Sequence, residues 1–182
     1  MNLNNGKAKI KNLGNNLTIR IPSKKNWFLL IFGTAWLGGW YFGFTSAIQM
    51  LGILEGDSTF GVDGFMTFWL IGWTIGGLFI TGLLLWGYFG SEQIQIENSK
   101  VKFSKTVFGL GIKKELEKSE VKNFRYNEIN ESWFGGSRWA MYGLGPGKVK
   151  FDYGLKTYSF GLAVDEAEAN HLIEKLNKRI LN

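Results

Sequence analysis

Two long stretches of the chain contain no charged residue and no histidine. They run from Asn26 to Leu54 and from Gly64 to Ser91. Each exceeds the roughly 20 apolar residues that an α-helix needs to cross the hydrocarbon core of a bilayer. Because a backbone in lipid must satisfy its own hydrogen bonds, both stretches are expected to be helical. The sequence therefore predicts a transmembrane helical hairpin over residues 26–90, with helices at about 27–50 and about 65–89.

Charge is distributed unevenly around the two stretches. Residues 1–25 contain basic residues and no acidic one, whereas the link between the stretches holds Glu55, Asp57 and Asp63 and no basic residue. Lys and Arg in short flanking segments remain on the cytoplasmic side of a membrane. We therefore expect both termini in the cytoplasm, the acidic link outside, and a multi-pass protein of the plasma membrane.

Small residues recur at helical spacing inside both stretches. Ala35, Gly39 and Gly43 form an i, i+4 row in the first, and Gly72 and Gly76 begin one in the second. Such rows allow close helix packing where lipid supplies no hydrophobic drive for association. They predict contact within the hairpin, with dimerisation through one face as the alternative. Since the polar residues of both stretches are uncharged, an anchor is favoured over an ion pathway.

The remainder, residues 91–182, reads as short strands followed by one helix. Ile94 and Ile96, and then Val101 and Phe103, alternate with polar residues, as half-buried strands do. Residues 165–181 change to the helical period, and Asp165 begins them as a possible N-cap, with Glu168 completing a capping-box pattern. The predicted fold is an α+β domain of about seven antiparallel strands, forming an open barrel that the C-terminal helix caps.

One predicted strand precedes the membrane. Residues 17–21 alternate between apolar and polar side chains and end at Pro22. Because both termini are expected on the same side of the membrane, we predict that this strand joins the cytoplasmic sheet.

The chain combines a set of features in a fixed order: Leu17–Ile21 with Pro22, Asn26–Trp27, Gly147–Gly154, Lys156–Gly161 and the Asp165–Ile180 helix. With these features, the order of elements resembles small bacterial membrane proteins that carry a pleckstrin-homology-like (PH-like) domain. The resemblance implies the fold and a bacterial cell membrane, but assigns no functional residue, since many such proteins have no assigned biochemical role.

Two groups of residues are candidates for contact with a lipid or a partner. An aromatic segment, 132–142, contains Trp133, Phe134 and Arg138, and suits a ligand rim, a partner surface or a wedge at the headgroups. The alternative is that Trp139 and Met141 belong to a core strand, with Trp133 and Phe134 covering a barrel end. The second group is basic, and the alternatives for it are topology signalling and a solvated strand face. Its members are Lys24, Lys25, Lys100, Lys102 and Lys105, extended by Lys113 and Lys114.

Catalytic chemistry has little support in the sequence. The chain has no Cys and a single His, His171, which leaves no thiolate and no imidazole pair for a metal. The Gly143–Lys148 run lacks the spacing of a phosphate loop and precedes a predicted strand. No catalytic, cofactor or metal residue is assigned, and nucleic acid is not an expected partner, because the net charge of +6 is modest.

The sequence therefore predicts a non-enzymatic membrane protein. Its PH-like domain binds or scaffolds a protein or lipid partner at the cytoplasmic face. The alternative is a structural subunit of a larger membrane complex that assembles through the glycine-rich helix faces. The pattern leaves the oligomeric state and the identity of the partner open.

Overall fold

The computed structural model describes residues 6–14, 16–50, 64–129 and 138–181. The chain divides into two compact units, one formed by residues 1–26 together with 86–182, and the other by residues 27–85. The segment before the first long helix therefore belongs with the C-terminal part of the chain, although the whole hairpin separates them in the sequence.

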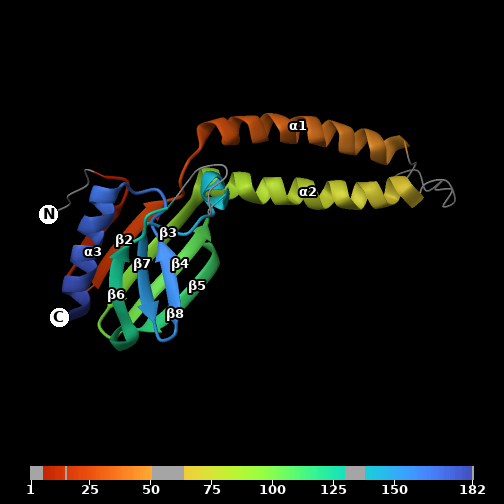
Figure 1. The fold of residues 1–182 in the computed structure, drawn as a ribbon. Coiled ribbons are helices and arrows are strands. Elements are labelled where there is room, and N and C mark those ends of the chain that lie inside the picture. The colour runs from red at the N-terminus through yellow and green to blue at the C-terminus, as the bar shows by residue number, and fades with distance from the viewer. Residues whose placement is uncertain (1–5, 15, 51–63, 130–137, 182) are drawn as a thin grey trace. The chain divides into compact units, whose positions relative to one another are not determined.

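The first unit is built from antiparallel strands and one helix (Figure 1). One sheet has five strands in the order β1-β2-β3-β4-β5, and the other has three in the order β6-β7-β8. The helix is α3 (Glu166–Leu181), and the short 3-10 helices are η1 (Lys118–Glu120) and η2 (Arg138–Tyr142). The strands are β1 (Lys9–Leu13), β2 (Asn16–Pro22), β3 (Gly90–Glu97), β4 (Lys100–Val107), β5 (Leu110–Glu117), β6 (Val121–Tyr126), β7 (Val149–Tyr153) and β8 (Lys156–Phe160).

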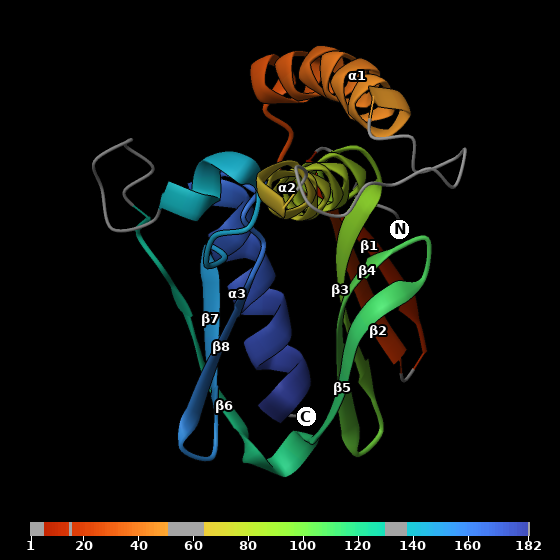
Figure 2. The same cartoon turned by 90° about the vertical axis from the view of Figure 1, so that its right-hand side faces the viewer.

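The core of this unit lies between the two sheets and α3. Figure 2 shows the sheets as separate layers with α3 between them. The ring of Phe151 on β7 is fully buried and stacks on Phe124 and Tyr158, at centroid distances of 5.3 and 5.5 Å. The apolar stripe of α3 buries Leu172 and Leu176 completely in the same cluster, as its helical period predicts.

The N-terminus of α3 is held by two carboxylates. Asp165 Oδ1 accepts a hydrogen bond from the Glu168 amide at 2.8 Å, which confirms the predicted N-cap. Glu168 also accepts from the Ala8 amide at 2.7 Å, and Arg179, near the other end of α3, donates to the Gly14 carbonyl. Both bonds tie α3 to the N-terminal segment.

The predicted strand at residues 17–21 is confirmed as part of the sheet. Strand β2 pairs with β3 from Leu17 opposite Ile96 to Pro22 opposite Ser91. Its Ile19 side chain is fully buried in the core.

The predicted open barrel of about seven antiparallel strands is confirmed only in part. The described residues form eight antiparallel strands, arranged in a five-stranded and a three-stranded sheet that do not close into a barrel. The additional strand is β1, which pairs with β2 at the edge of the larger sheet. Sequence analysis missed β1 because only Ile10 in it is partly buried, so the strand has no alternating apolar pattern.

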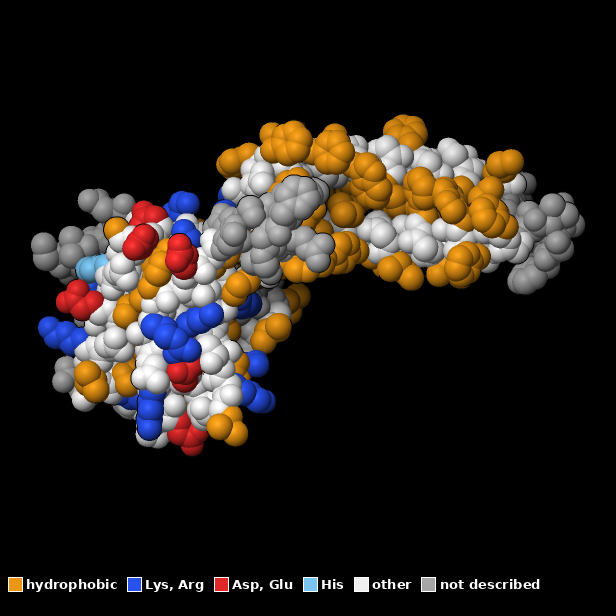
Figure 3. Space-filling view, in the orientation of Figure 1, with side chains coloured by type: hydrophobic (Ala, Val, Ile, Leu, Met, Phe, Trp, Pro, Cys, Tyr) orange, Lys and Arg blue, Asp and Glu red, His pale blue; other side chains and the backbone are white. Residues whose placement is uncertain are grey.

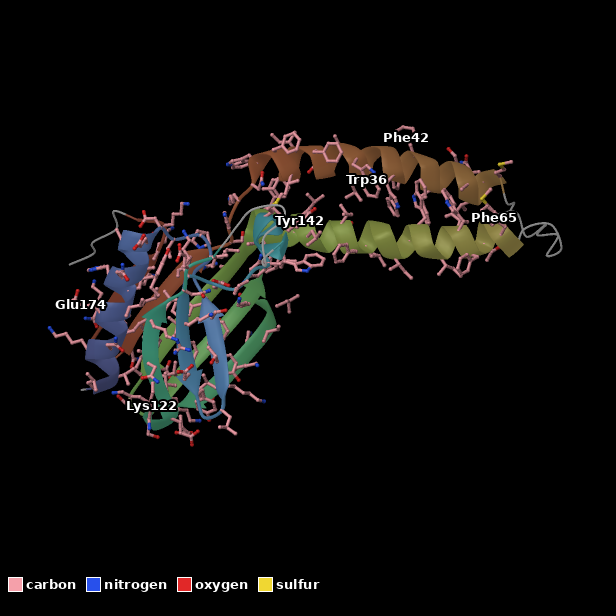
Figure 4. The ribbon with its side chains drawn as sticks, in the orientation of Figure 1. Trp36, Phe42, Phe65, Lys122, Tyr142 and Glu174 are labelled. Atoms are coloured by element: carbon pink, nitrogen blue, oxygen red, sulfur yellow. The ribbon has the colours of Figure 1, made fainter. Side chains whose placement is uncertain are left out.

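The second unit is the helical hairpin. Helix α1 (Trp27–Met50) has 24 residues and α2 (Gly64–Phe89) has 26, and both are long and apolar enough to cross a membrane. In the most apolar 18-residue stretch of each helix, only 6% of the residues of α1 and 11% of those of α2 are buried. Figure 3 shows hydrophobic side chains along both helices. Phe42 on α1 and Phe65 on α2, labelled in Figure 4, are each 77% exposed. A core helix of a soluble protein would bury such residues.

Several polar side chains of the hairpin form hydrogen bonds within it, although the buried indole nitrogen of Trp73 has no hydrogen-bond partner among the described residues. The hydroxyls of Thr34, Thr74 and Thr81 each donate to the carbonyl four residues earlier, at 2.7 to 2.8 Å. The Trp40 indole N–H donates to the Trp73 carbonyl of the other helix at 3.0 Å. Internal satisfaction of this kind is what a hydrocarbon environment requires.

Candidate functional site

The candidate basic residues do not form one patch. Lys24 and Lys25 follow β2, whereas the other three lie along β4. From Lys105 to Lys100 the strand runs five residues, or about 17 Å at 3.3 Å per residue. Lys100 and Lys102 make exposed ion pairs with Glu115 and Glu97, at 3.2 and 2.8 Å. Their charges are therefore partly compensated on the domain surface.

Lys105 belongs to a buried polar contact. Its ammonium donates to Glu92 Oε1 at 2.7 Å, and the two side chains are 28% and 6% exposed. The second oxygen of Glu92 accepts a hydrogen bond from the Gly161 amide, just after β8. The Glu92 carboxylate thus connects Lys105, on β4 of the larger sheet, to Gly161, which follows the last strand of the smaller sheet. This arrangement is structural, because both oxygens and the charge have partners.

Sequence analysis missed Glu92, although a signal was present. Glu92 and the buried residues Ile94 and Ile96 occupy every second position along β3. A strand that alternates strictly directs all three side chains to the same face. A carboxylate at a core position predicts a buried partner, but the sequence does not identify which of the lysines provides it.

The smaller sheet carries a second polar cluster on its outer face. Arg125 makes two bonds to Asp152, at 2.7 and 2.9 Å, and Thr157 donates to the same carboxylate at 2.8 Å. Asn123, in the left-handed region with φ of 56°, also donates to it at 3.2 Å where the register of β6 and β7 shifts. The partners of the Asp152 carboxylate are therefore one cation and two neutral side chains. An open depression of about 540 Å³ beside the cluster is lined in part by Lys122, labelled in Figure 4.

The Asp152 cluster predicts a pH-dependent contribution to stability. The Arg125 guanidinium, and after it the Thr157 hydroxyl, hold the pKa of Asp152 well below its usual range. A depressed folded-state pKa stabilises the fold above the unfolded value of about 4, and this stabilisation is lost as the pH falls below it. We expect the melting temperature of the native protein to fall more between about pH 5 and pH 3 than that of Asp152→Asn, as measured by thermal unfolding. Arg125→Ala should likewise show a smaller fall in melting temperature than the native protein. An equal fall in all three proteins would contradict the prediction.

The aromatic segment is described from residue 138 onward. Trp133 and Phe134 lie outside the described residues, and Arg138 begins η2. The interpretation of Trp139 and Met141 as part of a core strand was wrong, because they lie in this 3-10 helix. Its fully buried residue is Ala140, while Trp139 is 55% exposed. A helical turn does not follow the alternation of a strand, so the inward-facing residue changes.

This segment is fixed to the last turn of α2. The Trp86 indole donates to the Gly143 carbonyl at 2.7 Å, and both residues belong to the first unit. Gly143 adopts φ of 74°, which ends η2, and the chain continues through a loop into β7. The Gly143–Lys148 run therefore leads into a strand, as predicted, and not into the helix that a phosphate loop requires. The exposed Trp139 is thereby held near residues 86–89.

The glycines of the hairpin differ in what they contact. A Cβ added at Gly39, Gly72 or Gly76 would meet no atom within 4 Å, whereas one at Gly43 would lie 3.4 Å from Trp73. Among the glycines of the described hairpin, the most tightly covered is Gly77, which was not predicted as a packing position and against which the Trp40 indole packs.

An apolar groove of about 420 Å³ runs along the hairpin. Gly72 and Gly76 lie in it, so part of the predicted small-residue row faces open space within the described hairpin. Aromatic side chains make up the rest of its lining: Trp36, Trp40, Phe65, Phe68, Trp69 and Trp73.

Comparisons with protein-family models and with curated proteins find no match for this chain. Among the residues that the structure describes, no group of three or more His, Cys, Asp or Glu side chains is placed to hold a metal ion.

Proposed function

We propose that this chain is a non-enzymatic, multi-pass protein of the bacterial cell membrane. Its helical hairpin anchors a PH-like domain at the cytoplasmic face, where the domain binds or scaffolds a protein or lipid partner. The observation that carries the proposal is the pairing of β2 with β3, the strands on either side of the hairpin.

That pairing constrains the path of the chain through a membrane. Pro22 is opposite Ser91, and the Ser23 amide donates to the Gly90 carbonyl at 2.9 Å. Ser23 Oγ also donates to the Gly87 carbonyl in the last turn of α2, at 3.0 Å. Since paired strands are about 4.8 Å apart, the chain leaves the sheet and returns to it at neighbouring points. An even number of crossings, here two, satisfies this constraint, and the basic N-terminal flank favours the cytoplasmic side.

The architecture of the domain supports the PH-like part of the proposal. Two antiparallel sheets are followed by one C-terminal helix that fills the opening between them (Figure 2). The hairpin enters this fold between two adjacent strands of the larger sheet, so the domain is complete only when both ends of the hairpin return to it. An anchor placed in this way holds the domain close to the bilayer without a long linker.

A second candidate function is that of a structural subunit in a larger membrane assembly. The groove that contains Gly72 and Gly76 favours it, because glycines with open space beside them allow another helix to approach closely. Co-purification of other membrane proteins in detergent would support this function.

Cysteine labelling tests the membrane topology, because the chain has no Cys of its own. We expect Asp57→Cys, in the acidic link, to react with a membrane-impermeant maleimide in intact cells. Leu155→Cys, at the exposed β7–β8 turn, should react only after the membrane is opened. Reaction of Leu155→Cys in intact cells would overturn the cytoplasmic placement.

Capture of the tagged full-length protein tests the scaffolding role. Mass spectrometry of both lipids and proteins in the captured material identifies the class of partner. Reproducible enrichment of one protein or one lipid class is the expected result. Conversion of a small molecule by the purified protein would contradict the assignment as a non-enzyme.

A further inference from the structure

The turn between β4 and β5 exposes three large apolar side chains. Phe108, Leu110 and Ile112 are 72%, 80% and 61% exposed. None of them was a candidate from the sequence, and we call them the β4–β5 tip. Exposed apolar groups that cluster in this way mark a contact surface more often than isolated ones do.

The β4–β5 tip lies beside the end of α2. Gly90, which follows the last residue of α2, pairs with Val107, and Val107 pairs with Leu110. Two strand spacings therefore separate Gly90 from Leu110, or about 10 Å. The Phe108 ring packs directly on Phe89, the final residue of α2, at a centroid distance of 4.7 Å. Apolar surface thus continues from the helix onto the sheet.

Leu110 and Ile112 belong to the inner face of the larger sheet. Side chains at every second position of a strand lie on one face, so Leu110 and Ile112 lie on the same face of β5 as Leu116. Leu116 is buried in the core. Toward the tip, the burial of this face gives way to exposure. The tip is therefore a continuation of the core face that the described part of the domain leaves exposed.

The backbone of the tip favours a different residue at position 108. Phe108 and Gly109 have φ values of 50° and 83°, so both central residues of the turn are left-handed. Two-residue hairpin turns of this kind prefer Asn-Gly, and a bulky side chain is disfavoured there. Phe108 is exposed and adopts a backbone conformation that bulky residues disfavour, and this combination indicates a role beyond folding.

We propose that the β4–β5 tip inserts into the boundary between headgroups and acyl chains of the bilayer, in the leaflet where α2 ends. The bilayer is the occupant because Phe89 makes the tip continuous with a helix suited to cross it. Amphipathic elements enter this boundary by about 5–10 Å, which is enough to cover side chains of this size. Lys113, exposed on β5 next to Ile112, adds a cation suited to anionic headgroups. This inference rests on the proposed membrane location.

Single-cysteine fluorescence on the full-length protein in lipid nanodiscs tests the insertion. An NBD dye is attached at Leu110→Cys, at Leu155→Cys on the exposed β7–β8 turn, and at Leu78→Cys within α2. Replacing the lipid by one brominated on its acyl chains should quench the labels at 110 and 78 but not the label at 155. A label at 110 that is as accessible to an aqueous quencher as the label at 155 would overturn the proposal. A label at 110 that is shielded from water but not quenched by bromolipid would also overturn it, because a protein surface would then cover the tip. Loss of quenching at 78 would instead contradict the membrane location itself.

Phe108→Asn provides a matched variant that separates insertion from folding. It installs the preferred Asn-Gly turn, so the melting temperature should be unchanged or higher. Added to Leu110→Cys, it should reduce the quenching by bromolipid, because the ring that packs on Phe89 is lost. Unchanged quenching in this variant would refute a role for Phe108 in insertion.

Discussion

Replacing Ile19 by Asp is expected to unfold the unit formed by residues 1–26 and 86–182, while leaving the two long helices of the hairpin folded. Ile19 is fully buried and lies opposite Ile94 in the larger sheet. A carboxylate at that position would be buried without a partner, and the loss of stability should exceed about 4 kcal/mol. Limited proteolysis and circular dichroism of the detergent-purified chain measure the loss of the sheet.

Thr18→Asp is the matched control for this substitution. It introduces the same charge one residue earlier, on the opposite and partly exposed face of β2. We expect it to change the melting temperature far less than Ile19→Asp. Should both variants retain a protease-resistant 86–182 region, residues 16–22 would not be an integral strand of the domain.

Replacing Glu92 by Ala should be the most damaging substitution of any described acidic residue. It removes the acceptor for the Gly161 amide and leaves the partly buried Lys105 ammonium without its counter-charge. Breaking a buried pair by removing one partner costs about 3–5 kcal/mol, and the partial exposure of Lys105 suggests about 2–4 kcal/mol here. Chemical denaturation followed by near-UV circular dichroism gives the difference.

Glu97→Ala provides the comparison for Glu92→Ala. Glu97 makes an ion pair of similar length with Lys102 on the same two strands, but both side chains of this pair are more than a third exposed. Exposed pairs contribute about 0–1 kcal/mol, so this variant should be close to the native protein in stability. Equal losses in the two variants would mean that burial does not distinguish the two contacts.

The helices and the C-terminal stripe could be predicted because their signals are local. The charge-free stretches correspond to α1 and α2, and Asp165 caps α3 as its position predicted. The interior strands were visible for the same reason, since alternation directs each apolar residue to one face. Strand β1 escaped prediction because its burial is almost absent.

Contacts between distant segments could not be predicted in this way. The partner of Glu92, the packing of Trp40 on Gly77 and the contact of Phe108 with Phe89 all join residues far apart in sequence. For the described part of the aromatic segment, the sequence left core and exposed alternatives open. The structure decided between them by placing Trp139 in a 3-10 helix and not in a strand.

By itself, the sequence determined that the chain has two apolar helices long enough to cross a bilayer, a strand-rich remainder and an amphipathic C-terminal helix. These features depend on hydrophobicity and periodicity, which act over a few neighbouring residues. The sequence predicted that the strand before the hairpin joins the sheet, but only the tertiary structure decided that its partner is β3. The same holds for the burial of Glu92 against Lys105 and for the contact of the β4–β5 tip with the end of α2. Such arrangements depend on which surfaces meet when the whole chain folds, and no local pattern encodes that choice.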